Sequence, residues 1–188
     1  MRQQISDLIQ QILPHDALEK THIEETVAWI NSGVEIFRLE KPDIPDKHLV
    51  SYFLLFDEVA QKILLCDHKK AGLWLPLGGH VDPGENPRET ARRECFEELR
   101  IDADFCFQDP VFISSTVTVG LTPGHTDISL WYLLKGSCQD IYDFDVREFN
   151  AIQWFALDDI PYEASDPHMK RFIQKLRGHL PACHSEGV

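Results

Sequence analysis

Apolar residues recur at helical spacing in two segments near the N-terminal end of the chain. The stripes consist of Ile5, Leu8, Ile9 and Ile12, and of Ile23, Val27 and Ile30. Positions three and four residues apart share one side of a helix. The pattern therefore predicts two helices, one over residues 2–13 and one ending near Asn31, which form a helical extension over residues 1–45. A connector with two prolines is expected at residues 41–47.

The middle of the chain contains short runs of β-forming residues bounded by turn residues. Two of these runs, 48–56 and 62–66, are separated by a short polar turn and predict a hairpin. The other predicted elements are strands at 111–119, 127–134 and 151–155 and a helix at 87–99.

A last helix is expected close to the C-terminal end. Asp166 would be its N-cap, Pro167 its first residue, and Gly178 would follow its end. The order of elements predicts an α+β fold in which helices pack on an antiparallel or mixed sheet. We expect the main domain to cover residues 46–182, followed by a tail at 183–188.

The charge of the chain limits the partners that it can bind. The formal net charge is -13, whereas proteins that bind a nucleic-acid polymer usually present a basic face. A small phosphorylated substrate remains compatible with this charge if cations offset the repulsion. No apolar run approaches the roughly 20 residues of a membrane span, and the chain starts without a signal-peptide pattern. We therefore expect a cytoplasmic protein that binds neither a nucleic-acid polymer nor a membrane.

The five cysteines are scattered along the chain and form no C-x-x-C pair. Their odd number and wide spacing fit neither a disulfide framework nor a zinc cluster. We predict free and mostly buried thiols.

Carboxylates crowd the helix predicted at 87–99. Glu97 and Glu98 follow Glu94 by three and four residues, and like charges at these spacings weaken an isolated helix by roughly 0.2–0.5 kcal/mol per pair. Mg²⁺ prefers oxygen ligands and commonly uses carboxylates together with substrate phosphates, so divalent cations would compensate the repulsion. The alternative is an exposed acidic face, but such a face would not require the glycine-rich segment Leu75–Glu85 just before the helix.

Residues 79–101 resemble the Nudix box, whose pattern is G-x5-E-x7-R-E-U-x-E-E-x-G-U with U a bulky apolar residue. The matching positions are Gly79, Glu85, Arg93, Glu94, Glu97 and Glu98. The resemblance implies an α/β/α sandwich with a mixed sheet over about residues 46–180, preceded by the helical extension. Two positions differ, since Cys95 takes an apolar place and Arg100 replaces the last glycine. Arg100 would cost about 1 kcal/mol or more in the left-handed conformation, so we expect the helix to end differently.

The resemblance also implies roles for the carboxylates. Glu94 and Glu98 would bind Mg²⁺ or Mn²⁺ directly, Glu97 would bind it directly or through water, and the Gly79 carbonyl would add a ligand. The bound ions would polarise a diphosphate and lower the pKa of the attacking water.

Three further residues complete the predicted catalytic and metal site. Pairing of Glu85 with Arg93 would orient the glycine-rich segment on the helix. Outside the box, Glu148 is our candidate for a further metal ligand. Its charged neighbours fit a solvated surface equally well, so that alternative stays open.

A second group of residues could bind the substrate. The segment Gly124–Tyr132 contains His125, Asp127 and Trp131, which are able to stack on a base and to hydrogen-bond with its edge. The alternative is a strand whose aromatic side chains fill the core, and we prefer it for Trp131. His80 could approach a phosphate or a metal, or lie in a surface loop.

These features predict a metal-dependent hydrolase that cleaves the diphosphate linkage of a nucleoside diphosphate derivative. Nucleoside triphosphates, including oxidised ones, are the first expected substrate class, and ADP-ribose or a nucleotide sugar is the second. A non-catalytic Nudix-like domain that senses nucleotides and an isomerase of the isopentenyl-diphosphate type are the alternatives, although both usually have an eroded box. The N-terminal helices are expected to pack or to form a homodimer rather than to bind substrate.

Overall fold

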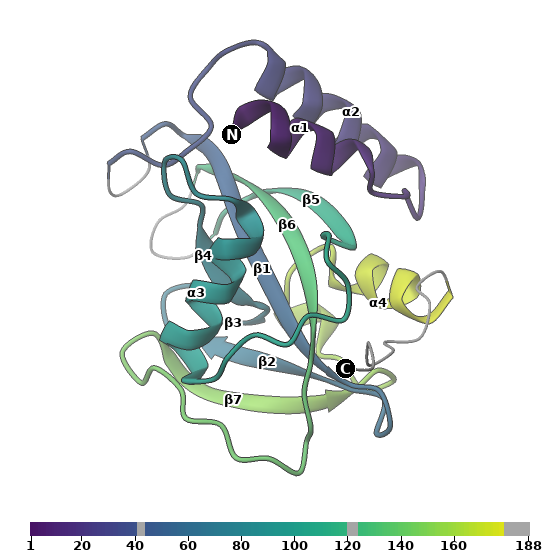
Figure 1. The fold of residues 1–188 in the computed structure, drawn as a ribbon. Helices are drawn as coiled ribbons and strands as arrows, with labels where there is room; N and C mark the ends of the chain where they lie inside the picture. The colour runs from purple at the N-terminus through teal and green to yellow at the C-terminus, as the bar shows by residue number, and fades with distance from the viewer. Residues whose placement is uncertain (41–43, 120–123, 179–188) are drawn as a thin grey trace, which may run out of the picture.

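The computed structural model describes residues 1–40, 44–119 and 124–178, and Figure 1 shows the arrangement of its elements. The helices are α1 (Arg2–Gln10), α2 (Ala17–Asn31), α3 (Pro87–Leu99) and α4 (Met169–Gly178), with a short 3-10 helix at Tyr162–Ala164. The strands are β1 (Lys47–Asp57), β2 (Lys62–His68), β3 (Leu73–Leu75), β4 (Leu77–His80), β5 (Phe112–Val117), β6 (Thr126–Lys135) and β7 (Phe149–Ala156). The predicted tail at 183–188 and part of the predicted connector lie outside the described residues.

Strand β1 is the central strand of a mixed sheet. Most of its side chains are buried, as expected for an apolar strand that is covered on both faces. It runs parallel to β6, in register from Lys47 opposite Thr126 to Phe56 opposite Lys135. Its other edge pairs antiparallel with β4 and then with β2. Strand β5 extends the sheet beyond β6, and β2 also pairs with β3 and β7.

Two hydrophobic cores lie on the two faces of this sheet. Alternate residues of β1 enter them, with Leu49, Phe53 and Leu55 in the first core and Leu54 and Phe56 in the second. Helices α1, α2 and α3 contribute to the first core and α4 to the second. This arrangement, visible in Figure 1, confirms the predicted α/β/α sandwich with its N-terminal helices.

The glycine-rich segment before α3 differs from the prediction. We expected a loop from Leu75 to Glu85, but residues 77–80 form β4 and pair with residues 50–53 of β1. Glycine has a low strand propensity, so the local sequence gives no strand signal. The pairing with β1 is a long-range interaction, and it fixes the backbone of these glycines beside α3.

The last helix begins later than predicted. Asp166 and Pro167 precede it, and α4 starts at Met169. The Asp166 carboxylate accepts the His168 N–H at 2.7 Å, and the Asp166 carbonyl accepts the Met169 N–H at 3.0 Å. Asp166 therefore closes a hydrogen-bonded turn ahead of the helix. Gly178 is the last residue of α4 instead of the residue after it.

The cysteines fit the prediction only in part. Cys66, Cys95 and Cys138 are free, and the first two are buried. Cys106 is disulfide-bonded, which contradicts the expectation of free thiols. Among the described helices, none combines the length and the apolar character needed to cross a membrane.

The N-terminal helices pack against the rest of the chain through a buried ion pair. Glu19 of α2 has no exposed surface, and its carboxylate accepts the Lys175 ammonium of α4 at 2.8 Å and the Ile113 N–H of β5 at 3.3 Å. Asp16 accepts two hydrogen bonds from Arg171, which hold the pKa of the Asp16 carboxyl well below its usual value. The two helices therefore pack on the domain, as one of our two alternatives proposed, and a homodimer stays a prediction.

This ion pair generates a prediction about stability. Replacing Glu19 by Ala leaves the buried Lys175 ammonium without its carboxylate, which typically costs about 3–5 kcal/mol. Glu24→Ala is the matched control, because Glu24 lies on the same helix with an exposed side chain and forms only a surface ion pair with Lys20. Urea unfolding followed by circular dichroism should show a much larger loss for Glu19→Ala. Equal losses would contradict the assignment of this pair as a structural link.

Candidate functional site

Helix α3 presents the carboxylates, and its two ends are well defined. The Asn86 side chain accepts the Arg88 N–H at 2.9 Å, and Pro87 is the first helical residue, which confirms the predicted start. At the other end, Arg100 adopts the left-handed conformation, with φ 58° and ψ 29°. Our expectation of a different helix end is therefore wrong. Arg100 takes the conformation that glycine would take, at the cost of some backbone strain.

The two glycines of β4 allow the strand to approach α3 closely. A Cβ atom on Gly79 would lie 2.2 Å from the Glu94 Oε1 atom, and one on Gly78 would lie 2.0 Å from the Ser51 carbonyl oxygen. Gly78 also has a φ of +134°, which other residues rarely adopt. Its N–H donates to the Glu98 carboxylate at 2.9 Å. Because Gly78 and Gly79 have no side chains, the backbone of β4 can lie next to Glu94 and Glu98.

Arg93 links the carboxylates of Glu85 and Glu94. Its guanidinium donates to both Glu85 oxygens, at 3.1 and 3.0 Å, and to Glu94 at 2.6 Å. The Thr90 hydroxyl donates to Glu85 at 2.7 Å. Burial raises the pKa of Glu85, but the hydrogen bonds from Arg93 and Thr90 outweigh that effect and leave the pKa below its usual value. Such a bidentate contact fixes geometry as well as charge.

Glu98 is buried and Glu94 is partly buried, and neither charge is fully compensated. Glu98 is only 5% exposed, and burial raises its pKa well above the usual value, with a further contribution from Glu94 and Glu148. Burial also raises the pKa of Glu94, although Arg93 opposes this shift. The negative charge of Glu94 contributes to the raised pKa of Glu98. Two desolvated carboxylates that repel each other are stabilised by a proton or by a bound cation. The site therefore has the charge and the oxygen donors that a divalent metal ion requires.

The carboxylates surround a small hollow of about 140 Å³. The structure brings Glu148 to this hollow together with Glu94, Glu97 and Glu98, although about fifty residues separate it from them. The hollow is also lined by Arg100, Asp145 and Arg147. From the sequence, Arg100 was considered only as a helix end, and the charges flanking Glu148 fitted a solvated surface. The Asp145 N–H donates to the Glu98 carbonyl at 2.9 Å, which fixes this segment beside α3.

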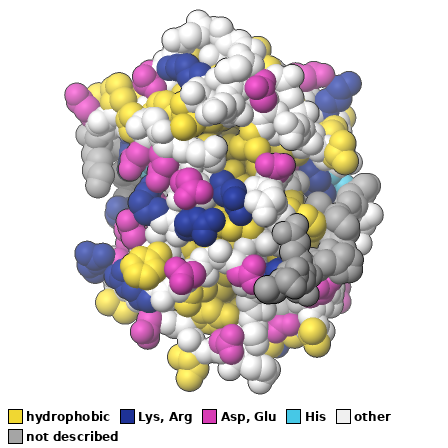
Figure 2. All heavy atoms as spheres, viewed as in Figure 1, with side chains coloured by type: hydrophobic (Ala, Val, Ile, Leu, Met, Phe, Trp, Pro, Cys, Tyr) yellow, Lys and Arg dark blue, Asp and Glu magenta, His cyan; other side chains and the backbone are white. Residues whose placement is uncertain are grey.

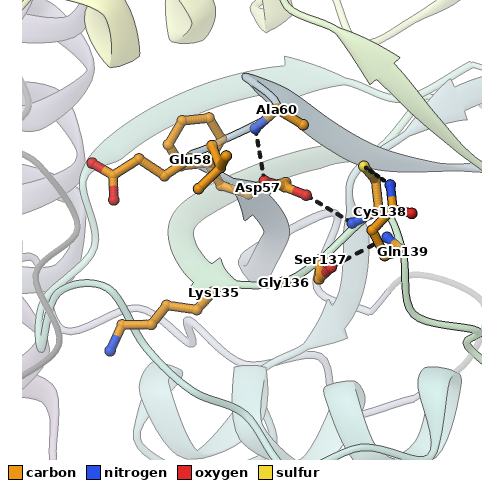
Figure 3. A pocket seen from close by; sticks show the side chains of 10 residues that line it. Asp57, Glu58, Ala60, Lys135, Gly136, Ser137, Cys138 and Gln139 are labelled. Atoms are coloured by element: carbon orange, nitrogen blue, oxygen red, sulfur yellow. Dashed lines mark hydrogen bonds between the residues drawn. The ribbon is translucent and has the colours of Figure 1, made fainter.

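A larger hollow of about 420 Å³ lies beside the turn after β1 and the segment that follows β6, and Figure 3 shows its lining. The Asp57 carboxylate is already used there, because it accepts the N–H groups of Ala60 at 2.8 Å and Cys138 at 2.9 Å. These bonds stabilise the two turns. The larger hollow therefore lacks the convergent carboxylates of the smaller one.

Of the four predicted substrate-binding residues, one lies in the core and the other three lie together in a cluster. Trp131 has no exposed surface, donates its Nε1–H to Ser114 and stacks on Phe172, so it cannot stack on a base. This corrects its assignment and confirms the alternative of a core residue. His80, His125 and Asp127 form a cluster with His48, a residue that the sequence analysis missed. A role of these three in substrate binding remains a prediction.

The surface in Figure 2 bears both signs of charge. On the face shown, acidic and basic side chains are intermixed, and no single basic patch dominates it.

Comparisons with known proteins place most of this chain in one sequence family. The family model of the NUDIX domain matches residues 46–176. An asymmetrical bis(5'-nucleosyl)-tetraphosphatase of Rattus norvegicus is 34% identical over 113 residues, which are 58% of this chain and 72% of that protein. A Bacillus subtilis (strain 168) protein, to which an 8-oxo-dGTP diphosphatase activity is provisionally ascribed, is 43% identical over 51 residues, 27% of this chain and 34% of that protein.

Solved structures share the same fold. A MutT NUDIX hydrolase from Burkholderia pseudomallei superposes with a TM-score of 0.54 at 23% identity, over 68% of this chain and 96% of that one. A C. elegans Ap4A hydrolase gives a TM-score of 0.51 at 20% identity, over 68% of this chain and 95% of the other. These likenesses agree with the sandwich described above.

The two glycines of β4 should tolerate alanine very differently. Gly78→Ala forces a Cβ into the Ser51 carbonyl and an unfavourable φ, so we expect a clear loss of melting temperature, with about 1–3 kcal/mol from the backbone alone. Gly79→Ala only displaces the flexible end of Glu94, so the fold should survive while Mg²⁺-dependent activity falls. Gly178→Ala is the control, because no atom of the described residues would lie within 4 Å of its Cβ. Full activity of Gly79→Ala would contradict the role of this close approach.

Proposed function

This chain belongs to the NUDIX family as a pyrophosphohydrolase that acts on nucleotide anhydride bonds, and we propose that it uses Mg²⁺ or Mn²⁺ to cleave nucleoside polyphosphates. The observation that carries this proposal is the convergence of Glu94, Glu97, Glu98 and Glu148 on one hollow beside Gly79. Enzymes of this family typically depend on divalent metal ions. The non-catalytic alternative does not fit, because every charged position of the box is intact.

The residues at the hollow fit a hard divalent cation. Glu98 and Glu94 would hold it directly, since both are desolvated and carry raised pKa values that a cation would reverse. Glu97 and Glu148 would complete the shell directly or through water, and the Gly79 carbonyl adds an oxygen. When bound, such ions draw phosphate oxygens into the site and make a nearby water more acidic.

Other residues of the site orient these ligands and bind the phosphate chain. Arg93 holds Glu85 and Glu94 in fixed positions, and the Gly78 N–H holds one oxygen of Glu98. Arg100 and Arg147 line the hollow, and we infer that their guanidinium groups attract the phosphates. Arg93 therefore acts as a positioning residue, because its hydrogen bonds go to the ligands.

The expected substrates carry three or more phosphates. Nucleoside triphosphates, including oxidised ones, are the class that the sequence suggested. We add bis(5'-nucleosyl) tetraphosphates as a further expected class, because the similarity to the rat bis(5'-nucleosyl)-tetraphosphatase covers 72% of that protein. A longer phosphate chain offers more oxygens to a site with four carboxylates and their cations. ADP-ribose and nucleotide sugars, which carry only a diphosphate, are the second candidates.

Metal binding should stabilise the folded protein. Because the partly buried Glu94 and the buried Glu98 repel each other without a cation, Mg²⁺ should bind the native state preferentially. At a hundred times its Kd the gain is about 2.7 kcal/mol. Differential scanning fluorimetry with millimolar MgCl₂, compared with NaCl of equal ionic strength, measures the rise in melting temperature. A melting temperature that Mg²⁺ leaves unchanged would exclude this site as a tight metal site.

Glu98→Gln should separate stability from activity. The substitution keeps the size of the side chain and an oxygen for the Gly78 N–H, while it removes repulsion with Glu94 and Glu148, so the metal-free protein should melt at the same or a higher temperature. Turnover should fall by about a hundredfold or more, because metal stabilisation of phosphoryl charge contributes several kcal/mol.

The activity assay uses a panel of substrates with Mg²⁺. The panel contains nucleoside triphosphates, an oxidised triphosphate, a bis(5'-nucleosyl) tetraphosphate, ADP-ribose and a nucleotide sugar, and product release is measured for the parent protein and Glu98→Gln. We expect the polyphosphates to turn over faster than the two diphosphate compounds. Preference for ADP-ribose would overturn the substrate class, and a fully active Glu98→Gln would overturn the mechanism.

A further inference from the structure

We propose that His48, His80, His125 and Asp127 form a second metal site, which binds a divalent transition-metal ion, with Zn²⁺ as the preferred ion. One ligand atom from each of these residues lies within 4.8 Å of all the others. His48 and His125 are buried, and Asp127 is 9% exposed. The group is thus a compact set of three imidazoles and one carboxylate, in which His80 is partly exposed. It goes beyond the proposed hydrolysis, which uses none of these side chains.

The sheet register places the whole cluster on the face opposite α3. His48 of β1 lies beside Asp127 of β6, and His80 of β4 lies beside Val50, which is two residues after His48. Side chains two apart along a strand share a face, and directly paired residues do so as well. His125 precedes Asp127 by two. Because Gly79 faces Glu94 of α3, its neighbour His80 points to the other side of β4.

The hydrogen bonds of His48 determine which ring nitrogen is available. Its Nδ1 atom lies 2.8 Å from the Pro45 carbonyl oxygen, which can only accept, so Nδ1 carries the proton. In the neutral ring, Nε2 is then a bare acceptor. It lies 3.1 Å from the Asp127 Oδ1 atom, which is also an acceptor. Two buried acceptors this close require positive charge between them.

A proton does not fill this role well. The separation of 3.1 Å would suit a hydrogen bond between His48 Nε2 and Asp127 Oδ1. Neither atom, however, has a hydrogen-bond partner among the residues that the structure describes. At that distance the geometry fails through direction, because the ring N–H would not aim at the oxygen. A metal ion can instead lie off the line that joins the two atoms.

His125 repeats the arrangement of His48. Its Nδ1 atom lies 2.9 Å from the Thr118 hydroxyl, and that hydroxyl donates its single proton to the His125 carbonyl at 3.2 Å. Nδ1 is therefore the donor, and the Nε2 lone pair faces Asp127 Oδ1 at 3.4 Å. Histidines that bind metal usually donate their second ring N–H to an outer group in this way, which fixes the tautomer.

The donor set and its spacing indicate the ion. Imidazole nitrogen suits Zn²⁺ and its neighbours in the transition series, whereas Mg²⁺ prefers oxygen. Tetrahedral Zn²⁺ with bonds of about 2.0–2.1 Å places its ligand atoms about 3.3 Å apart. The two contacts of Asp127, at 3.1 and 3.4 Å, already match this spacing. Small movements of His80 would close the remaining distances.

Such an ion would tie three strands together on the face of the sheet opposite α3. It would join β1, β4 and β6 at the end of β4, next to Gly79. The His80 carbonyl accepts a hydrogen bond from Arg93 at 3.4 Å, so the segment that carries His80 is also linked to the Glu85 pair. We therefore assign the ion a structural role that keeps β4 in place.

The test uses the full-length protein, stripped of metal with a chelator and titrated with Co²⁺, whose tetrahedral complexes absorb visible light. Millimolar Mg²⁺ is present throughout to occupy the carboxylate hollow. We expect a saturable absorption at one Co²⁺ per chain that Zn²⁺ abolishes by displacement. Absence of the saturable signal would overturn the proposal.

Variants locate the bound ion. Asp127→Asn keeps the shape of the side chain and should lose the Co²⁺ absorption, as should His48→Gln, while circular dichroism shows whether each variant is folded. Glu98→Gln and His15→Ala are the controls and should retain the absorption. A signal lost in Glu98→Gln but kept in folded Asp127→Asn would assign the ion to the carboxylate hollow and refute a second site.

The same measurements separate this site from the proposed function. Co²⁺ absorption is read without substrate, so a failure of the nucleotide panel leaves the metal result unaffected. If the parent protein shows no Co²⁺ absorption and Asp127→Asn raises KM for a nucleotide, the cluster binds substrate as the sequence suggested. That outcome would also overturn the second metal site.

Discussion

The close approach of β4 to α3 is the constraint on which the site depends. At Gly78 and Gly79 the strand has no side chains, and a Cβ at either position would overlap Ser51 or Glu94. This contact brings the backbone of a sheet strand next to the carboxylates of a helix. The pairing of β4 with β1 holds the strand there, so the geometry of the site is built into the sandwich itself.

Electrostatics then decides what the site can bind. Arg93 compensates the charge of Glu85 and part of the charge of Glu94 through its hydrogen bonds. In its buried position the Glu98 carboxylate accepts the Gly78 N–H, and burial and the acidic neighbours raise its pKa. The Arg93 guanidinium thus compensates part of the negative charge on α3. The charge of Glu98 would be compensated by a bound cation.

The alternation of side chains along β4 gives its two faces different chemistry. Gly79 faces the carboxylates of α3, where oxygen ligands suit a hard cation such as Mg²⁺. His80 faces His48 and Asp127, where imidazole nitrogens suit a borderline ion such as Zn²⁺. One short strand therefore separates an environment of carboxylates from one of imidazoles, and this separation follows from the period of a strand.

The sequence alone determined the charged positions of the Nudix box, the start of α3 at Asn86 and Pro87, and the layered architecture, because capping residues, periodicity and fixed spacing are local signals. Tertiary structure made the glycine-rich segment a strand by pairing it with β1, and it established the core position that we had preferred for Trp131. It also brought Glu148 to the carboxylates and His48 to the other histidines. These features arise from the pairing and packing of distant segments, which no local pattern encodes.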